Sequence, residues 1–189
     1  MENPFSVALE GDGFFQIRTE SGELQYTRDG SFEISPVANG NMLCTSDGNP
    51  VLDAYGNQII LPSNRVATDL VVNQDGTLAF PDGTGNPAVI TDANGRPVKF
   101  GIYQFNNPAG LSKEGSNNYS VTVASGAAVA ENGNAAVKQT KTHQYYTEAS
   151  NVDVANEMVN LIVAQRAYEM NSKAIQASDE MMQQANALR

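Results

Sequence analysis

The sequence predicts a mainly β fold with a long C-terminal α-helix: an irregular β-hairpin domain in residues 1–147, then a coiled-coil-type helix in residues 148–189. Two observations lead to this fold class. All eight prolines lie at or before Pro108 and all sixteen glycines at or before Gly133, so the last part of the chain lacks the residues that interrupt helices. Asp-Gly and Asn-Gly pairs, which favour tight turns, recur throughout the first part.

Short apolar runs flank these turn pairs and predict the strands of the first domain. Residues 24–27 and 31–34 are expected to form a hairpin around Arg28-Asp29-Gly30, because apolar and polar residues alternate on both sides of it. The pattern leaves a sandwich, an open barrel and irregular stacked hairpins open, and the uneven turn spacing excludes a strict repeat array. The other predicted strands are residues 14–17, 42–45, 51–52, 70–72, 77–80, 98–103 and 119–123.

Residues 151–188 contain neither Gly nor Pro and are rich in Ala, Glu, Met, Gln and Leu. This composition predicts one continuous helix. Ser150 is the expected N-cap, with Asp153 reaching back to it in a capping box. Such a helix is about 55 Å long, which exceeds what a small β domain can cover.

Apolar side chains on this helix fall into two stripes that lie about 200° apart around its axis. The first stripe recurs every seven residues, and the second is rich in alanine. A helix that packs on one small domain needs only one stripe, so two stripes favour neighbours from other chains over a core within the same chain. The candidate assembly residues are Val154, Met158, Leu161, Tyr168, Ile175 and Met182 on the first stripe, and Val163, Ala167, Met170, Ala174, Ala177 and Met181 on the second.

The overall composition excludes several classes of protein. Eleven basic and twenty-one acidic residues give a formal charge of −10, which argues against nucleic acid as a partner, because nucleic acid requires clustered Lys and Arg. One Cys and one His cannot build a disulfide framework or a Cys/His zinc site within one chain. The longest apolar run, 161–164, is far shorter than the roughly twenty residues of a membrane span, so no membrane insertion is expected. The start of the sequence predicts no cleaved signal peptide.

No residue pattern supports catalysis, a cofactor or a metal site. The lone His143 has no nucleophile at a diagnostic spacing, and Cys44, which alternates with strand residues, is expected to be a small core residue. The segment Asp92-Ala93-Asn94-Gly95 begins like a calcium-binding loop, but Arg96 and Pro97 do not continue it. We therefore expect this segment to form a turn and the chain to have no enzyme activity.

Five segments carry a more specific signal. The strongest runs from Glu148-Ala149-Ser150-Asn151-Val152-Asp153 through Ala164-Gln165-Arg166-Ala167-Tyr168 to Lys173. Together and in order, the five segments resemble the bacterial flagellar rod and hook axial proteins, and the last segment is most similar to the distal-rod members. The segments are residues 8–15, 26–32, 43–48, 105–111 and 148–173.

The resemblance implies a structural subunit of the flagellar basal-body rod, within a helical tube that transmits torque from motor to hook. In this family, terminal helices pair into an inner layer and β domains lie outside it. The implied partners are therefore copies of the chain and other rod and hook subunits. Family members leave the cell unfolded through the flagellar type III apparatus, without a cleaved signal. A proximal-rod or hook subunit and a secreted β-rich binding or adhesin module stay open as alternatives.

One feature departs from the family pattern. Family members carry a long helix ahead of the Gly-Asp-Gly motif, whereas Met1 lies only ten residues before Gly11 here. We interpret this as a truncation rather than as an unusually short member. Without the N-terminal partner the C-terminal helix loses half of its inner-layer packing. We therefore expect this chain alone to be monomeric or weakly associating, with residues 176–189 prone to fraying.

Overall fold

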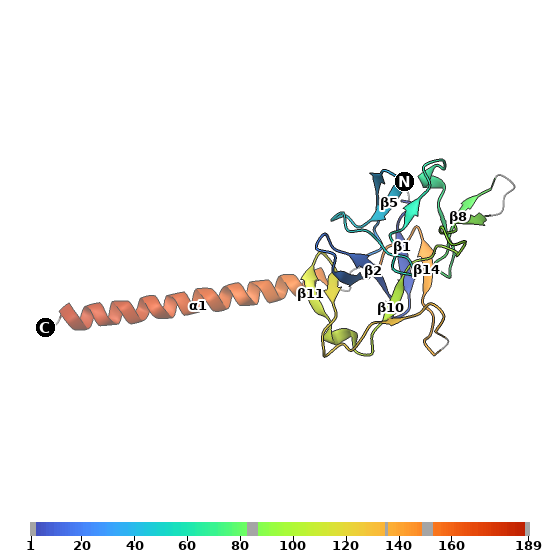
Figure 1. Ribbon diagram of the computed structural model, residues 1–189. Helices are drawn as coiled ribbons and strands as arrows, with labels where there is room; N and C mark the ends of the chain where they lie inside the picture. Colours follow the sequence, from blue (N-terminus) through green and yellow to red (C-terminus); the bar gives the residue numbers. More distant parts are fainter. Residues whose placement is uncertain (1–2, 83–86, 135, 149–152, 188–189) are drawn as a thin grey trace. The chain divides into compact units, whose positions relative to one another are not determined.

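The computed structural model describes residues 3–82, 87–134, 136–148 and 153–187. The chain divides into two compact units, Met1–Glu148 and Ala149–Arg189, called here the β unit and the helical unit. Figure 1 shows short strands throughout the first and a single helix in the second. The mainly β fold with a long C-terminal helix is thus confirmed.

The largest sheet of the β unit has six short strands, all paired antiparallel. Its central strand, β2, follows the Gly-Asp-Gly segment as the sequence predicts. Segments far apart in the chain pair within this sheet, because β3 lies between β2 and the much later β12. In spatial order the strands are β11 (Ser112–Gly115), β12 (Asn118–Ser120), β3 (Leu24–Thr27), β2 (Phe14–Arg18), β10 (Ile102–Gln104) and β13 (Val129–Ala130).

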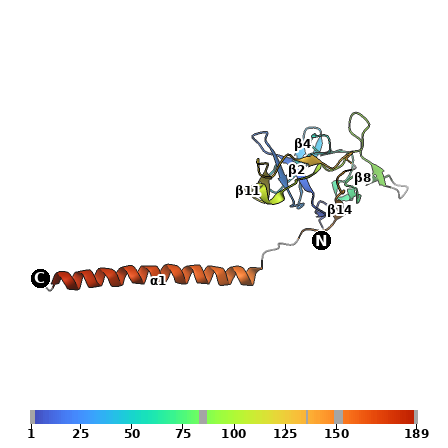
Figure 2. The same cartoon turned by 90° about the horizontal axis from the view of Figure 1, so that it is seen from below.

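Three smaller antiparallel sheets complete the described part of the β unit, and the strands seen in Figure 2 are correspondingly short. Two 3₁₀ helices, η1 (Ala67–Asp69) and η2 (Pro108–Gly110), lie in the connections. Among the alternatives left open by the sequence, this arrangement matches irregular hairpins. The small sheets are β1 (Val7–Glu10) with β14 (Lys141–Gln144); β4 (Glu33–Val37), β5 (Gly40–Cys44) and β6 (Ile60–Leu61); and β7 (Val71–Val72), β8 (Leu78–Pro81) and β9 (Pro87–Val89).

The core of the β unit lies on both faces of β2. Phe15 and Ile17 point into the larger hydrophobic cluster, where the ring of Phe15 contacts Phe32 and Phe100 edge-on at 5.0 and 5.1 Å between centroids. Phe14 points to the other face, into a smaller cluster that includes Tyr26. Alternate side chains of a strand point to opposite faces, so one strand supplies both clusters and holds them together.

The prediction of a hairpin around Arg28-Asp29-Gly30 is wrong. β3 pairs with β2 and β12, whereas the strand that follows this turn, β4, pairs with β5 in a different sheet. Gly30 does not have the positive φ of a tight hairpin turn. Its carbonyl accepts a hydrogen bond from the Val7 N–H at 3.0 Å, so this corner directs the chain from one sheet to another.

The predicted strand 51–52 is wrong, because Val51 and Leu52 form only isolated bridges, to Ile17 and Gln58. Other predicted strands are shorter in the structure, 98–103 and 119–123 most of all. In residues 98–103 the regular strand begins only at Ile102, because Lys99 and Phe100 form isolated bridges to Thr77 and Asp53 instead of a ladder. In residues 119–123 the strand ends at Ser120. There the Thr122 hydroxyl accepts hydrogen bonds from the N–H groups of residues 124 and 125, and such a local turn competes with strand pairing.

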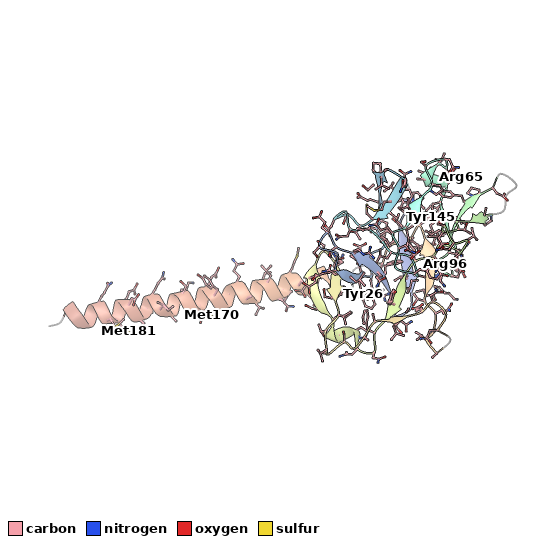
Figure 3. All side chains as sticks on the ribbon, in the orientation of Figure 1. Tyr26, Arg65, Arg96, Tyr145, Met170 and Met181 are labelled. Carbon is pink, nitrogen blue, oxygen red and sulfur yellow. The ribbon has the colours of Figure 1, made fainter. Side chains whose placement is uncertain are left out.

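The turn at Asp92 is built as the sequence predicts. The Asp92 carboxylate accepts hydrogen bonds from the N–H groups of Asn94 and Arg96, and the Arg96 guanidinium donates two more at 2.9 and 2.7 Å. The same guanidinium lies 3.9 Å from the centre of the Tyr55 ring; Figure 3 labels Arg96. The carboxylate oxygens are therefore engaged in holding the turn.

We expect the pKa of the Asp92 carboxyl to lie below the ordinary value of about 3.9, because hydrogen bonds from the Arg96 N–H and guanidinium favour the charged form. A lowered pKa means that this interaction stabilises the turn above about pH 4 and that the stabilisation is lost as the pH falls through the folded-state pKa. Carboxyl-carbon NMR titration measures the shift. Arg96→Ala should raise the pKa of Asp92 back towards its ordinary value, and Lys99→Ala should leave the pKa of Asp92 unchanged. Equal pKa values of Asp92 in both variants would contradict the role assigned to Arg96.

The helical unit contains α1 (Val154–Ala187), about 51 Å long at 1.5 Å per residue. Its start differs from the prediction, since Asp153 lies just before the first turn and its carboxylate accepts a hydrogen bond from the Ala155 N–H at 3.0 Å. Asp153 therefore acts as the N-cap, and a second oxygen accepts a bond from the Asn156 side chain at 2.8 Å. Ser150, the predicted cap, lies outside the described residues.

Candidate assembly surface

α1 exposes every side chain that the structure describes on it, from Ala155 to Gln183. Many of these are large and apolar, and Tyr168 is 76% exposed. Within residues 153–187 the structure contains no helix or strand besides α1, so no other element of the helical unit covers these side chains. None of the described helices, α1 included, combines the length and the apolar character that a membrane span needs. The exposed apolar surface of α1 is thus its main chemical feature.

The structure brings both predicted stripes onto this one helix, and the side chains lie on nearly opposite faces at 100° per residue. Figure 3 labels Met170 and Met181, which belong to the second stripe. Val154 begins the helix, but its side chain lies outside the described part of the chain. The exposed members are Met158, Leu161, Tyr168, Ile175 and Met182 on the first stripe, and Val163, Ala167, Met170, Ala174, Ala177 and Met181 on the second.

The two stripes differ in character. The second alternates steps of four and three residues without interruption from Val163 to Met181, the spacing of a coiled-coil seam. Its three alanines would let a partner backbone approach closely. The first stripe is interrupted by polar residues at its alternate positions, Gln165, Ser172 and Asp179.

Sequence reasoning missed two exposed apolar residues near the start of α1. Val159 and Ile162 are 57% and 50% exposed, and at 100° per residue Ile162 lies between the two stripes. The first turns are therefore apolar on most of their circumference, a property of helices that are buried on several sides. The signal was present in the apolar run 161–164.

A second surface feature lies on the β unit, where β14 pairs with β1. On the outer face of this pair His143 Nε2 lies 2.7 Å from Glu10 Oε2. The hydrogen bond from His143, followed by the charge of Lys141, holds the pKa of Glu10 below its ordinary value. Together with Ala8, Leu9, Tyr146, Thr147 and Glu148, the pair lines a groove of about 540 Å³.

His143 and Cys44, the residue types that most often carry chemistry, are both engaged in the structure. The His143 ring contacts Glu10 and lies edge-on to Tyr146. Cys44 is buried, its thiol donates to the Glu33 carbonyl at 3.5 Å, and burial raises the thiol pKa. The prediction that Cys44 is a small core residue is confirmed.

Comparison with known families places two domains on this chain. Residues 8–80 match the flagellar hook protein FlgE/F/G D1 domain, and residues 143–188 match the C-terminal domain of the flagellar basal body rod FlgEFG proteins. The first match runs from within β1 to within β8, and the second covers the end of β14 together with α1. Both surface features therefore lie within matched segments.

Individual relatives agree with these matches. The chain is 40% identical over 187 residues to a flagellar basal-body rod protein FlgG of Borreliella burgdorferi, covering 97% of this chain and 64% of that protein. It is 36% identical over 190 residues to FlgG of Caulobacter vibrioides, covering 100% and 66%, and 37% identical over 183 residues to FlgG of Bacillus subtilis, covering 94% and 62%. The chain thus spans somewhat less than two thirds of the length of these relatives.

The resemblance found in the sequence motifs is confirmed by these findings. The matched domains follow one another in the chain, and the relatives align with nearly all of it. The chain belongs to the family of flagellar basal-body rod and hook proteins.

Proposed function

We propose that this chain is a structural subunit of the distal rod of the bacterial flagellar basal body, part of a helical tube that transmits torque from motor to hook. The observation that carries the proposal is α1, whose described side chains, from Ala155 to Gln183, are all exposed and include two apolar stripes. The names of the relatives, flagellar basal-body rod protein FlgG, support the basal-body rod as its place, and the similarity of residues 148–173 to distal-rod members favours the distal part of it.

Physical reasoning links the exposed helix to assembly. Burial of one large apolar side chain such as Leu161 or Met170 contributes about 1.5–3 kcal/mol, so each stripe favours a partner. Because the stripes lie on nearly opposite faces, one partner helix cannot cover both. A subunit whose helix has neighbours on two sides suits a closed or helical array of copies better than a single dimer.

The proposed partners are further copies of the chain and other rod and hook subunits. The proposed site of action is the rod of the basal body, reached through the flagellar type III apparatus without a cleaved signal peptide. This part of the proposal rests on the family, whose domain descriptions include both rod and hook proteins. The twelve stripe residues, from Val154 to Met182, are the proposed assembly interface.

Deletion of the gene that encodes this chain, followed by imaging of basal bodies by electron cryotomography, tests the function. We expect cells without hooks, whose basal bodies stop at the rod, and complementation by the intact gene. Complete filaments in the deletion strain would overturn the proposal.

Single substitutions on α1 test the interface. Complementation with Ala174→Glu should fail, because a charged side chain on the alanine-rich second stripe blocks close packing and would bury an unpaired charge. Asn171→Glu is the matched control, since Asn171 lies on α1 between the stripes and is exposed. Motility in soft agar is the measurement. Equal motility of the two variants would contradict the assignment of the second stripe.

A further inference from the structure

Arg28 joins three segments of the β unit at one point. Its NH1 group donates to the carbonyls of Gly11 and Gly13 at 2.9 and 3.0 Å, and its guanidinium lies 5.6 Å from the centre of the Phe14 ring. Its Nε donates to the Glu148 carboxylate at 2.8 Å. Glu148 is the last residue of the β unit, so Arg28 holds the end of this unit against its beginning.

Contacts other than the one with Glu148 already hold the guanidinium of Arg28 in place. Two backbone carbonyls and an aromatic ring fix its orientation, and its side chain is only 27% exposed. Exposed ion pairs usually contribute little, because two long side chains must be ordered to form them. Because the Arg28 side chain is already fixed, only the Glu148 side chain has to be ordered when the ion pair forms, and this makes the pair more favourable than one between two mobile side chains.

The chain just before Glu148 has an unusual backbone. Gln144 is firmly anchored, since its side chain donates to the carbonyls of Pro4 and Leu70 and accepts from the Val72 N–H. Tyr145, labelled in Figure 3, then adopts a φ of +67°. This left-handed conformation costs a residue with a side chain roughly 1–2 kcal/mol, and it ends β14, although the Tyr145 N–H still donates to the Ser6 carbonyl at 2.8 Å.

We propose that residues 145–148 form a latch, closed by the Arg28–Glu148 ion pair, which holds the strained backbone of Tyr145 and fixes the point where the chain leaves the β unit. When the ion pair opens, Tyr145 relaxes towards an extended conformation and residues 146–148 leave the β unit. The groove beside His143 exists only with the latch closed, because Tyr146, Thr147 and Glu148 form one of its walls.

The latch determines how far the start of α1 can move from its anchor. From Glu148 to the helix cap Asp153 is five residues along the chain, and five residues span at most about 18 Å. With the latch open the last anchored residue is Gln144, nine residues from the cap, with a reach of at most about 32 Å. A closed latch therefore shortens the stretch of chain between the last anchored residue and the proposed assembly helix from nine residues to five. This consequence rests on the proposed function, whereas the latch itself does not.

Amide hydrogen exchange of the isolated chain, read by NMR, tests the latch. Glu148→Ala should speed exchange of the Tyr145 amide about two- to fivefold, the effect of losing an ion pair of this kind. Glu148→Gln, which keeps an oxygen that can accept from Arg28, should give a smaller increase. Glu114→Ala is the control, because Glu114 lies on the fully exposed strand β11. An unchanged exchange rate in Glu148→Ala would overturn the latch.

Two further measurements separate the parts of the proposal. Adding Tyr145→Asn to Glu148→Ala should restore part of the protection of the residue 145 amide against exchange, since asparagine tolerates the left-handed conformation. If this amide were as unprotected in the double variant as in Glu148→Ala, the role of Tyr145 would be overturned. Spin labels on β11 and at Ala155 should show a broader distance distribution in Glu148→Ala than in Glu114→Ala, and equal widths would overturn the restriction of reach. These readouts need no assembled rod, so their failure is distinct from a failure of the proposed function.

Discussion

Replacing Phe15 by alanine is expected to lower the free energy of unfolding of the β unit by about 3–5 kcal/mol. Phe15 is 0% exposed, and its ring packs edge-on against those of Phe32 and Phe100. Removing it leaves a cavity beside the central strand of the largest sheet. Because domains of this kind are stable by roughly 5–15 kcal/mol, the substitution removes a large part of the total.

Urea unfolding measures this loss. The near-ultraviolet signal of the tyrosines reports on the β unit, since the chain has no tryptophan and Tyr26 lies in the smaller core cluster. Leu24→Ala is the control, because Leu24 is 47% exposed at the start of β3. A loss in Phe15→Ala no greater than in Leu24→Ala would contradict the central place assigned to Phe15.

Replacing Gly30 by alanine is expected to destabilise the β unit by about 3 kcal/mol or more, at the upper end of what overpacking costs. A Cβ atom at this position would lie 1.8 Å from the Val7 carbonyl oxygen and 3.2 Å from the ring of Phe15. The first neighbour is backbone, so β1 would have to move away. That movement would also break the hydrogen bond from the Val7 N–H to the Gly30 carbonyl.

Gly22→Ala separates this steric effect from backbone preference. Gly22 has a φ of +87°, and a Cβ added there would meet no neighbouring atom within 4 Å, so its substitution costs only the left-handed penalty of about 1–2 kcal/mol. In thermal unfolding, the midpoint temperature of Gly30→Ala should therefore lie well below that of Gly22→Ala. The reverse order would show that the approach of β1 is not what requires glycine at position 30.

Several local features were predictable because the residues that create them are close in the chain. The turns at Gly48 and Gly76 have the positive φ expected of Asp-Gly pairs, and the strands that flank residues 73–76, β7 and β8, pair as predicted. The helix was predictable for the same reason, since its composition and its 3.6-residue period are local properties. Its N-cap was misplaced by three residues, because Ser150 and Asp153 both suit that position.

The candidate site could be predicted only in part. Both stripes of α1 follow from spacing alone, and the structure shows their described side chains exposed. The contact of Arg28 with Glu148 could not be found in this way, because 120 residues separate them and no periodicity relates such positions. The left-handed backbone of Tyr145 was equally hidden, since a tyrosine carries none of the signals of a turn.

Gly30 shows most clearly where sequence reasoning ends. By itself the sequence determined the fold class, the helix with its two apolar stripes, and the turns in which glycine adopts a positive φ. Only the tertiary structure decided which strands pair. It also decided that glycine is required at position 30 because β1 packs closely against it, rather than because of a hairpin turn, and that Arg28 holds the end of the β unit. The physical reason is that backbone preferences act between neighbouring residues, whereas strand pairing and close approach depend on how distant segments pack around a shared core.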